Sequence, residues 1–307
     1  MPSTSQFTLK EITQVGFVVK DAEKTAKAWD LMFGIGPWTF WYTEGTNLKG
    51  RYKDVFHKVR LAQTRLGNLI LELVEPVEGK AVHAEFLDKF GEGIQHIQVC
   101  TDDIDGNAEK LAAQGAEYVL KSVRGTAYMG NLPGGLVLEI VWNRTPPVFT
   151  GELSKPDASK QVKLKEMGQI GYVVKDVEKV SKAWTELFGL GPWRFFEIEG
   201  TDAGGKYKGI YHKEKIASTK LADLSIEIIQ PVIGKAVHGT FLEEHGEGIQ
   251  HVLHRFDDLE KEIAKLTDQG GECVLYFPGH VAYMGNLPGG LVLEMVQTGA
   301  GAPIAKK

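Results

Sequence analysis

The sequence Gly-Glu-Gly-Ile-Gln-His occurs twice in this chain of 307 residues, at 91–96 and at 246–251. The longer sequence Tyr-Met-Gly-Asn-Leu-Pro-Gly-Gly likewise occurs at 128–135 and at 283–290. Both pairs are separated by 155 residues (246 − 91, 283 − 128). Because the offset is constant, the chain is a tandem repeat of one module, with no insertion or deletion between the matched segments.

Each copy of the repeat predicts two βαβββ units. In the first copy, an apolar strand is followed by a helix that Asp21 caps and that ends near Phe33, and three strands come next. A short helix then leads into a second round of the same order. The strands are expected at 12–19, 38–44, 52–62, 67–75, 93–101, 116–122, 125–130 and 135–142, and the other helices near 80–90 and 104–114. Three consecutive strands favour an α+β fold with mostly antiparallel sheets.

The repeat also predicts the domain organisation. We expect an N-terminal domain at 8–143, a linker at 144–162 and a C-terminal domain at 163–298. The linker contains Pro146, Pro147 and Pro156, which cannot continue a helix or a central strand. Two similar modules in one chain predict a fused pseudo-dimer, with further homodimerisation possible.

Composition limits the classes of function. The net charge is −5, which gives no electrostatic reason to expect nucleic acid or an anionic membrane as a partner. No apolar run is long enough to span a bilayer, and residues 1–10 lack the apolar core of a signal peptide. The two cysteines, Cys100 and Cys273, do not form a disulfide pattern. We therefore expect a cytoplasmic protein with two free thiols.

Polar side chains interrupt the predicted strands at four positions of each copy. Each shares a strand face with apolar residues two positions away, as Glu72 does with Ile70 and Val74. The four positions are Gln14, Glu72, His96 and Glu139 in the first copy, and Gln169, Glu227, His251 and Glu294 in the second.

A single glutamate or histidine on a strand usually has an ordinary structural role. Here all four positions recur, although the copies differ at others, such as Asn68 and Asp223. A buried carboxylate needs a cation, a proton or a paired base. Two carboxylates, one imidazole and one amide oxygen suit zinc, cobalt, nickel or manganese, so the sequence predicts a divalent metal site in each copy.

These segments resemble the vicinal oxygen chelate superfamily, which includes glyoxalase I, methylmalonyl-CoA epimerase and the extradiol dioxygenases. The resemblance lies in residues 14–21, 71–76, 86–97 and 134–140, and it covers both halves. It implies paired βαβββ units that curve around a metal cleft, with the eight positions above as ligands. The segments 86–97 and 134–140 are most similar to the epimerase.

The first ligand position distinguishes among the members. Epimerases and dioxygenases commonly begin the set with His, whereas Gln14 and Gln169 match the set of eukaryote-like glyoxalase I. Non-haem iron oxygenases use two histidines and one carboxylate, so this set argues against oxygen chemistry. Residues 131–135 differ from the Asp-Pro-Asp-Gly turn that is usual in glyoxalases.

Three functions follow from the resemblance. The first is a metal-dependent epimerase or isomerase that moves a proton next to the carbonyl of a small carbonyl or acyl-thioester substrate. The second is a glutathione-dependent lyase of the glyoxalase I type, and the third is a small-molecule binding or resistance protein without turnover. The candidate proton-transfer residues are Glu139, Glu294, His57 and His212. His83 and His238 are interpreted as structural or rim residues.

Overall fold

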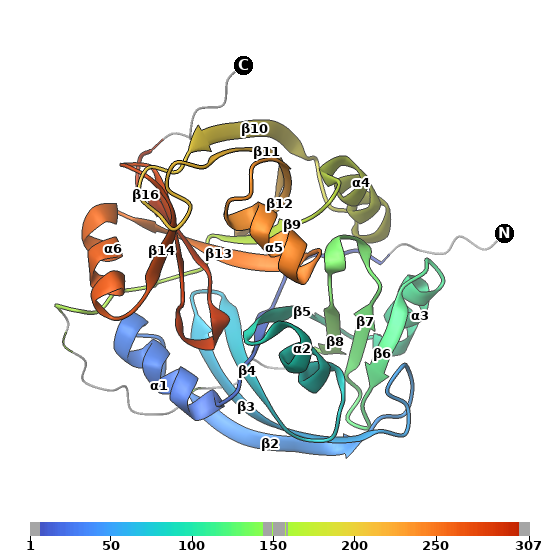
Figure 1. Ribbon diagram of the computed structural model, residues 1–307. Helices are drawn as coiled ribbons and strands as arrows, with labels where there is room; N and C mark the ends of the chain where they lie inside the picture. Colours follow the sequence, from blue (N-terminus) through green and yellow to red (C-terminus); the bar gives the residue numbers. More distant parts are fainter. Residues whose placement is uncertain (1–6, 144–148, 150–156, 158, 301–307) are drawn as a thin grey trace.

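The computed structural model describes residues 7–143, 149, 157 and 159–300. The first half contains eight strands and three helices, followed by the equivalent elements of the second half (Figure 1). The strands of the first half are β1 (Gln14–Val18), β2 (Thr39–Thr46), β3 (Phe56–Leu66), β4 (Leu69–Glu78), β5 (Gly93–Thr101), β6 (Glu117–Lys121), β7 (Ala127–Gly130) and β8 (Leu138–Trp142). Its helices are α1 (Ala22–Phe33), α2 (Val82–Phe90) and α3 (Ile104–Ala112), with a short 3₁₀ turn, η1 (Pro133–Gly135).

The second half repeats this order, so the predicted α+β tandem architecture is confirmed. Its strands are β9 (Gln169–Val173), β10 (Arg194–Thr201), β11 (Tyr211–Leu221), β12 (Leu224–Ile233), β13 (Gly248–Phe256), β14 (Glu272–Phe277), β15 (Val281–Gly285) and β16 (Leu293–Gln297). Its helices are α4 (Val177–Phe188), α5 (Val237–His245) and α6 (Leu259–Asp268), with the turn η2 (Pro288–Gly290).

Each half folds into one curved, eight-stranded sheet. The strand order of the first sheet is β2-β3-β4-β1-β5-β8-β7-β6, and the second sheet has the equivalent order. The contacts β1–β4 and β5–β8 are parallel, and the other neighbours are antiparallel. The predicted mostly antiparallel sheets are therefore observed. Strands β1, β4, β5 and β8, on which the four polar positions lie, are consecutive at the centre of the sheet.

The third predicted strand was misplaced by four residues, since β3 begins at Phe56 and not at residue 52. Residues 51–54 form a turn, in which Asp54 has a φ of 64°. At its other end, β3 continues to Leu66 and joins β4 through the two-residue turn Gly67-Asn68. Such a tight turn requires a positive φ, and Gly67 provides it at 58°.

The two halves pack against each other (Figure 1) and share one hydrophobic core. The indole of Trp29 in α1 donates a hydrogen bond to the Pro288 carbonyl at 2.8 Å, and Trp184 in α4 donates to the Pro133 carbonyl at the same distance. These pairs are equivalent, because 184 − 29 and 288 − 133 are both 155. The fused pseudo-dimer is therefore supported by a reciprocal contact between the halves.

Gln161 and Val162, at the end of the expected linker, donate hydrogen bonds to α1, and most of the rest of the linker lies outside the described residues. Cys100 and Cys273 are free thiols, as expected. No helix among the described residues is long and apolar enough to cross a membrane.

Candidate metal centres

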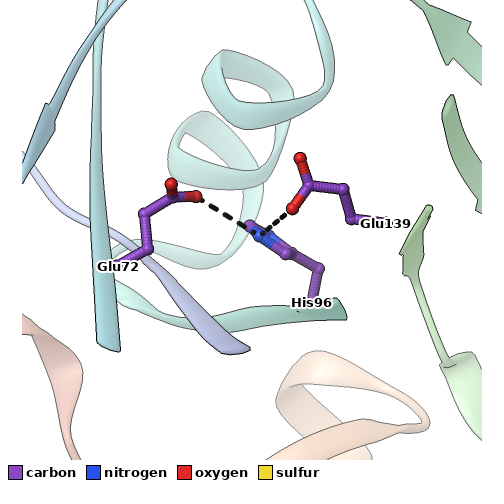
Figure 2. Close-up of side chains that lie close together, drawn as sticks. All are labelled: Glu72, His96 and Glu139. Atoms are coloured by element: carbon purple, nitrogen blue, oxygen red, sulfur yellow. Dashed lines mark ion pairs between the residues drawn. The ribbon is translucent and has the colours of Figure 1, made fainter. Parts of the chain in front are cut away.

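Each sheet brings two carboxylates and one imidazole together on its concave face. In the first half, Nε2 of His96 lies 3.6 Å from a carboxylate oxygen of Glu72 and 3.6 Å from one of Glu139 (Figure 2). The two carboxylates approach the ring from opposite sides. In the second half, Nε2 of His251 lies 3.2 Å from Glu294, and Glu227 completes the group. Each triad is therefore built within one half.

The spacing of these atoms fits a divalent cation. Within each triad, one ligand atom from each residue lies within 4.8 Å of the other two. Two ligands of a tetrahedral zinc ion lie about 3.4 Å apart, because each is about 2.1 Å from the ion. Nε2 of His96 is buried and has no hydrogen-bond partner among the described residues. A metal ion would satisfy this nitrogen and both carboxylates together.

Electrostatics also favour a cation at these positions. Burial raises the pKa of Glu139, and the neighbouring Glu72 carboxylate raises it further. Burial, Glu294 and Glu214 raise the pKa of Glu227 well above its usual value. Two buried carboxylates in contact repel each other, so without a positive ion one of them tends to hold a proton.

A glutamine next to each histidine fixes the imidazole in the form that binds metal. Nδ1 of His96 lies 3.1 Å from Oε1 of Gln95, and Nδ1 of His251 lies 2.8 Å from Oε1 of Gln250. The amide oxygen can only accept, so Nδ1 carries the proton and the lone pair of Nε2 faces the carboxylates. The Gln95 amide nitrogen donates to the Val82 carbonyl at 3.0 Å, which holds the amide in this orientation.

A glycine on the neighbouring strand makes room for each imidazole. Gly16 in β1 lies opposite His96, and a Cβ atom at Gly16 would lie 2.0 Å from Cε1 of the ring. Gly171 in β9 has the same relation to His251, also with 2.0 Å. These glycines were not predicted as part of the site, although a repeated glycine inside a strand often indicates a close approach of another group.

The two expected glutamine ligands have different surroundings. Gln169 donates to Glu227 at 2.9 Å and to Glu294 at 3.2 Å, so it joins the second triad directly. Gln14 is buried in the first half and accepts a hydrogen bond at 2.9 Å from Gln63, which also donates to Glu72 at 2.6 Å. The Gln169 amide nitrogen faces the carboxylates, so ligation through its oxygen requires the amide to rotate by half a turn.

A cavity of about 760 Å³ opens onto the first centre. Its lining includes Gln14, Glu72 and Glu139, and apolar side chains such as Leu61 and Ile70. The second half contributes Met167 and the β11–β12 turn (221–224) to the cavity lining, in which Asn68 donates a hydrogen bond to Asp223 at 2.8 Å. The cavity has the size of a small-molecule site, and both halves contribute to its lining.

The other four histidines named from the sequence are all buried. His57 is buried and lines the cavity, and His212 is also buried. His83 and His238 were interpreted as structural or rim residues, and their burial contradicts only the rim position. Their rings lie 6.0 Å from His96 and 5.7 Å from His251 between centroids, because α2 and α5 pack against the concave faces.

Two tyrosines that the sequence analysis missed complete the surroundings. The rings of Tyr128 and Tyr283 lie 5.2 Å from His96 and 5.1 Å from His251 between centroids. Burial raises the pKa of both phenols well above the usual value, and the nearby glutamates raise it further, so both are neutral hydrogen-bond donors. The signal that could have found them is the repeated sequence Tyr-Met-Gly-Asn.

Comparisons with known proteins agree with this architecture. The family model described as the glyoxalase/bleomycin resistance protein/dioxygenase superfamily matches residues 13–131 and 168–284. Among curated proteins, no significant match is found.

Solved structures share the fold at low sequence identity. A triple mutant of 4-hydroxymandelate synthase from Streptomyces coelicolor superposes with a TM-score of 0.64 at 13% identity, over 97% of this chain and 95% of that one. A xylose isomerase-like TIM barrel/4-hydroxyphenylpyruvate dioxygenase fusion protein gives 0.54 at 12% identity, over 98% of this chain and 52% of that one. The family model matches most of the chain in two copies, so this protein is a tandem two-module member of the glyoxalase/bleomycin resistance protein/dioxygenase superfamily.

Proposed function

We propose that this chain is a divalent-metal-dependent enzyme that moves a proton on the carbon next to a carbonyl group, as an epimerase or isomerase does. The observation that carries the proposal is the convergence of two carboxylates and one imidazole in each half. The cavity above Glu72 and Glu139 supports a small carbonyl or acyl-thioester substrate.

The proposed ligands are Gln14, Glu72, His96 and Glu139 in the first half, and Gln169, Glu227, His251 and Glu294 in the second. A zinc, cobalt, nickel or manganese ion bound there would act as a Lewis acid on the substrate carbonyl. The chain itself supplies the shape of the cavity, the fixed imidazole tautomers and the groups that accept the proton.

Two kinds of residue are proposed to move the proton. One is a ligand carboxylate, Glu139 or Glu294. The other is His57 or His212. His57 lines the cavity, its Nδ1 has no hydrogen-bond partner among the described residues, and burial lowers its pKa. His57 is therefore neutral at pH 7 and able to accept a proton.

The set of ligands supports proton transfer over oxygen chemistry. Non-haem iron oxygenases bind iron with two histidines and one carboxylate. Each centre of this chain contains one histidine and two carboxylates, with a glutamine nearby. The dioxygenase named in the fusion protein above shares the fold at 12% identity. An identity this low does not assign its reaction to this chain.

A glutathione-dependent lyase of the glyoxalase I type is the second candidate, because its ligand set is also Gln, Glu, His and Glu. Both reactions require proton transfer at carbon, so only the substrate distinguishes them. A binding protein without turnover is the third candidate, and it needs no metal.

The test uses the metal-loaded protein in D₂O with acyl-CoA thioesters, 2-oxo acids and the hemithioacetal of methylglyoxal and glutathione. We expect deuterium at the carbon next to the carbonyl of a thioester or oxo acid, without uptake of oxygen. The double variant His57→Gln/His212→Gln should lower the exchange rate by about two to four orders of magnitude if the histidines carry the proton. Oxygen uptake with ferrous iron, without deuterium exchange, would overturn the proposal.

A further inference from the structure

One position on the concave face differs in chemistry between the two halves. Val59 in β3 is an apolar residue of the first half, and its equivalent in β11 is Glu214 (59 + 155). Val59 lines the cavity of the first half, so this position faces the concave side. The second half therefore has a third buried carboxylate next to its candidate metal centre.

Glu214 is held by two histidines. The side chains of Glu214, His212 and His238 are at most 2% exposed. Oε1 of Glu214 lies 2.7 Å from Nδ1 of His238 and 3.1 Å from Nδ1 of His212. Burial alone would raise the pKa of Glu214, but the two histidines lower it to about 2, so the carboxylate is ionised.

An ionised carboxylate can only accept hydrogen bonds, so both imidazoles donate their Nδ1 protons to Glu214. When either ring is in its neutral form, its Nε2 therefore carries the lone pair. Both Nε2 atoms are buried and have no hydrogen-bond partner among the described residues. This carboxylate–imidazole arrangement prepares a histidine to accept a proton at Nε2.

His238 is the histidine of the pair that lies next to the metal centre. Its ring centroid is 5.7 Å from that of His251 and 5.1 Å from that of Tyr283. In the first half, His83 lies in the same position, 6.0 Å from His96 and 5.3 Å from Tyr128. The two surroundings therefore match, except for the carboxylate.

The first half has no carboxylate at this position, so nothing equivalent fixes the tautomers of His57 and His83. Neither nitrogen of His83 has a hydrogen-bond partner among the described residues, and neither does Nδ1 of His57. Burial lowers the pKa of both rings, so they are neutral, but no acceptor selects which nitrogen carries the proton.

We propose that Glu214 is a positioning residue that directs Nε2 of His238 toward the substrate of the C-terminal centre, and that the two centres are therefore not equivalent. The role of His238 in turnover rests on the proposed function. His238 is thereby added to Glu294 and His212 as a candidate proton acceptor of the C-terminal centre. In that step, the C–H bond next to the carbonyl breaks, its proton moves to Nε2 of His238, and the electron pair moves to the carbonyl oxygen.

The tautomers are measurable without any substrate, by long-range ¹H–¹⁵N NMR of histidine-labelled full-length protein. His238→Gln and His212→Gln assign the signals. We expect the proton of His238 on Nδ1 in the wild type, and the loss of this preference in Glu214→Val, which carries the residue of the first half. Glu214→Gln should retain the preference, because the amide oxygen still accepts.

The reciprocal variant Val59→Glu should create the same preference at His83, and it does not depend on the folding of Glu214→Val. Unchanged His96 signals control for the fold of the first half in the Glu214 variants. A wild-type His238 with its proton on Nε2, or a signal unchanged in Glu214→Val, would overturn the proposal.

Activity then tests the role in turnover. In Glu72→Gln, which leaves the C-terminal centre intact, adding Glu214→Val should slow deuterium exchange about 100-fold or more. In Glu227→Gln, which leaves only the N-terminal centre, adding Glu214→Val should change the rate of deuterium exchange little. An equal rate with and without Glu214 in the Glu72→Gln protein would overturn the proposal but leave the proposed function standing. Absence of exchange in the wild type would instead overturn the proposed function. The NMR measurement of the His238 tautomer would then still test whether Glu214 positions this histidine.

Discussion

The geometry of each candidate metal centre depends on the residues next to the ligands as well as on the ligands. His96 can reach the two glutamates only because Gly16 has no side chain, and its tautomer is fixed by Gln95. His251 has the same relation to Gly171 and Gln250. A repeated histidine predicts a ligand, but the space that the ring needs becomes visible only when β1 and β5 are paired.

Alanine at Gly16 should displace the His96 ring and weaken metal binding at the first centre only. We expect at least a tenfold loss of affinity for zinc or cobalt, since changes around a metal ligand typically cost 10–100-fold. Competition with a chromogenic chelator measures this loss. Gly93→Ala is the matched control, because a Cβ atom there meets only Phe86, at 3.9 Å. Equal affinity in Gly16→Ala and Gly93→Ala would contradict the packing argument.

The lowered pKa of Glu214 predicts a pH-dependent contribution to stability. The folded-state pKa is about 2, below the ordinary value of 4.5, so the folded state favours the ionised form. This contribution is fully present above about pH 4.5 and is lost as the pH falls toward 2. The difference in melting temperature between wild type and Glu214→Gln, measured in chelator, should shrink over this range. A difference that grows toward pH 2 would contradict the assignment.

At the scale of helices and strands, the sequence predicted most of the order and several boundaries. The N-cap of α1 was predicted at Asp21, whose side chain accepts a hydrogen bond from the Lys24 amide at 2.9 Å. The capping residue and the apolar spacing are local signals, so they are visible in a sequence. The start of β3 was missed because residues 51–54 form a turn, in which the Arg51 amide donates to the Tyr118 carbonyl, far away in the sequence.

The same difference between local signals and long-range contacts explains which site residues were predicted from the sequence. Gln14, Glu72, His96 and Glu139 interrupt apolar strands, so their pattern is local. The placement of His83 next to His96 depends on how α2 crosses the sheet, and periodicity carries no information about that crossing. Glu214 could not be found from the repeat, because the equivalent residue of the first copy is Val59.

The caps of the first helix of each half give an element-scale prediction. Asp21→Ala and Asp176→Ala each remove a side-chain hydrogen bond to the first turn, at 2.9 Å in both helices. Each should cost about 1 kcal/mol of unfolding free energy. Asparagine at either position should restore most of the loss, since its side chain also caps. Denaturant unfolding measures the effect, and an alanine variant as stable as the wild type would contradict the assigned cap.

At the scale of the whole molecule, the two halves behave as a dimer joined in one chain. Trp29 bonds to Pro288 of the other half, and the equivalent residue of its own half is Pro133. A fragment of residues 1–150 can therefore replace the missing half only with a second copy of itself. We expect a homodimer or an aggregate by light scattering. A stable, well-folded monomer would show that the halves do not need each other.

The repeated ligand set predicts two divalent ions per chain, one in each half. Elemental analysis of protein purified without chelator tests it most directly. The wild type should approach two ions per chain, Glu72→Gln and Glu227→Gln one each, and the double variant none. Glu78→Gln, an exposed position on the same strand as Glu72, should retain two. A wild type without bound divalent ions, or a double variant that still holds two, would contradict the claim.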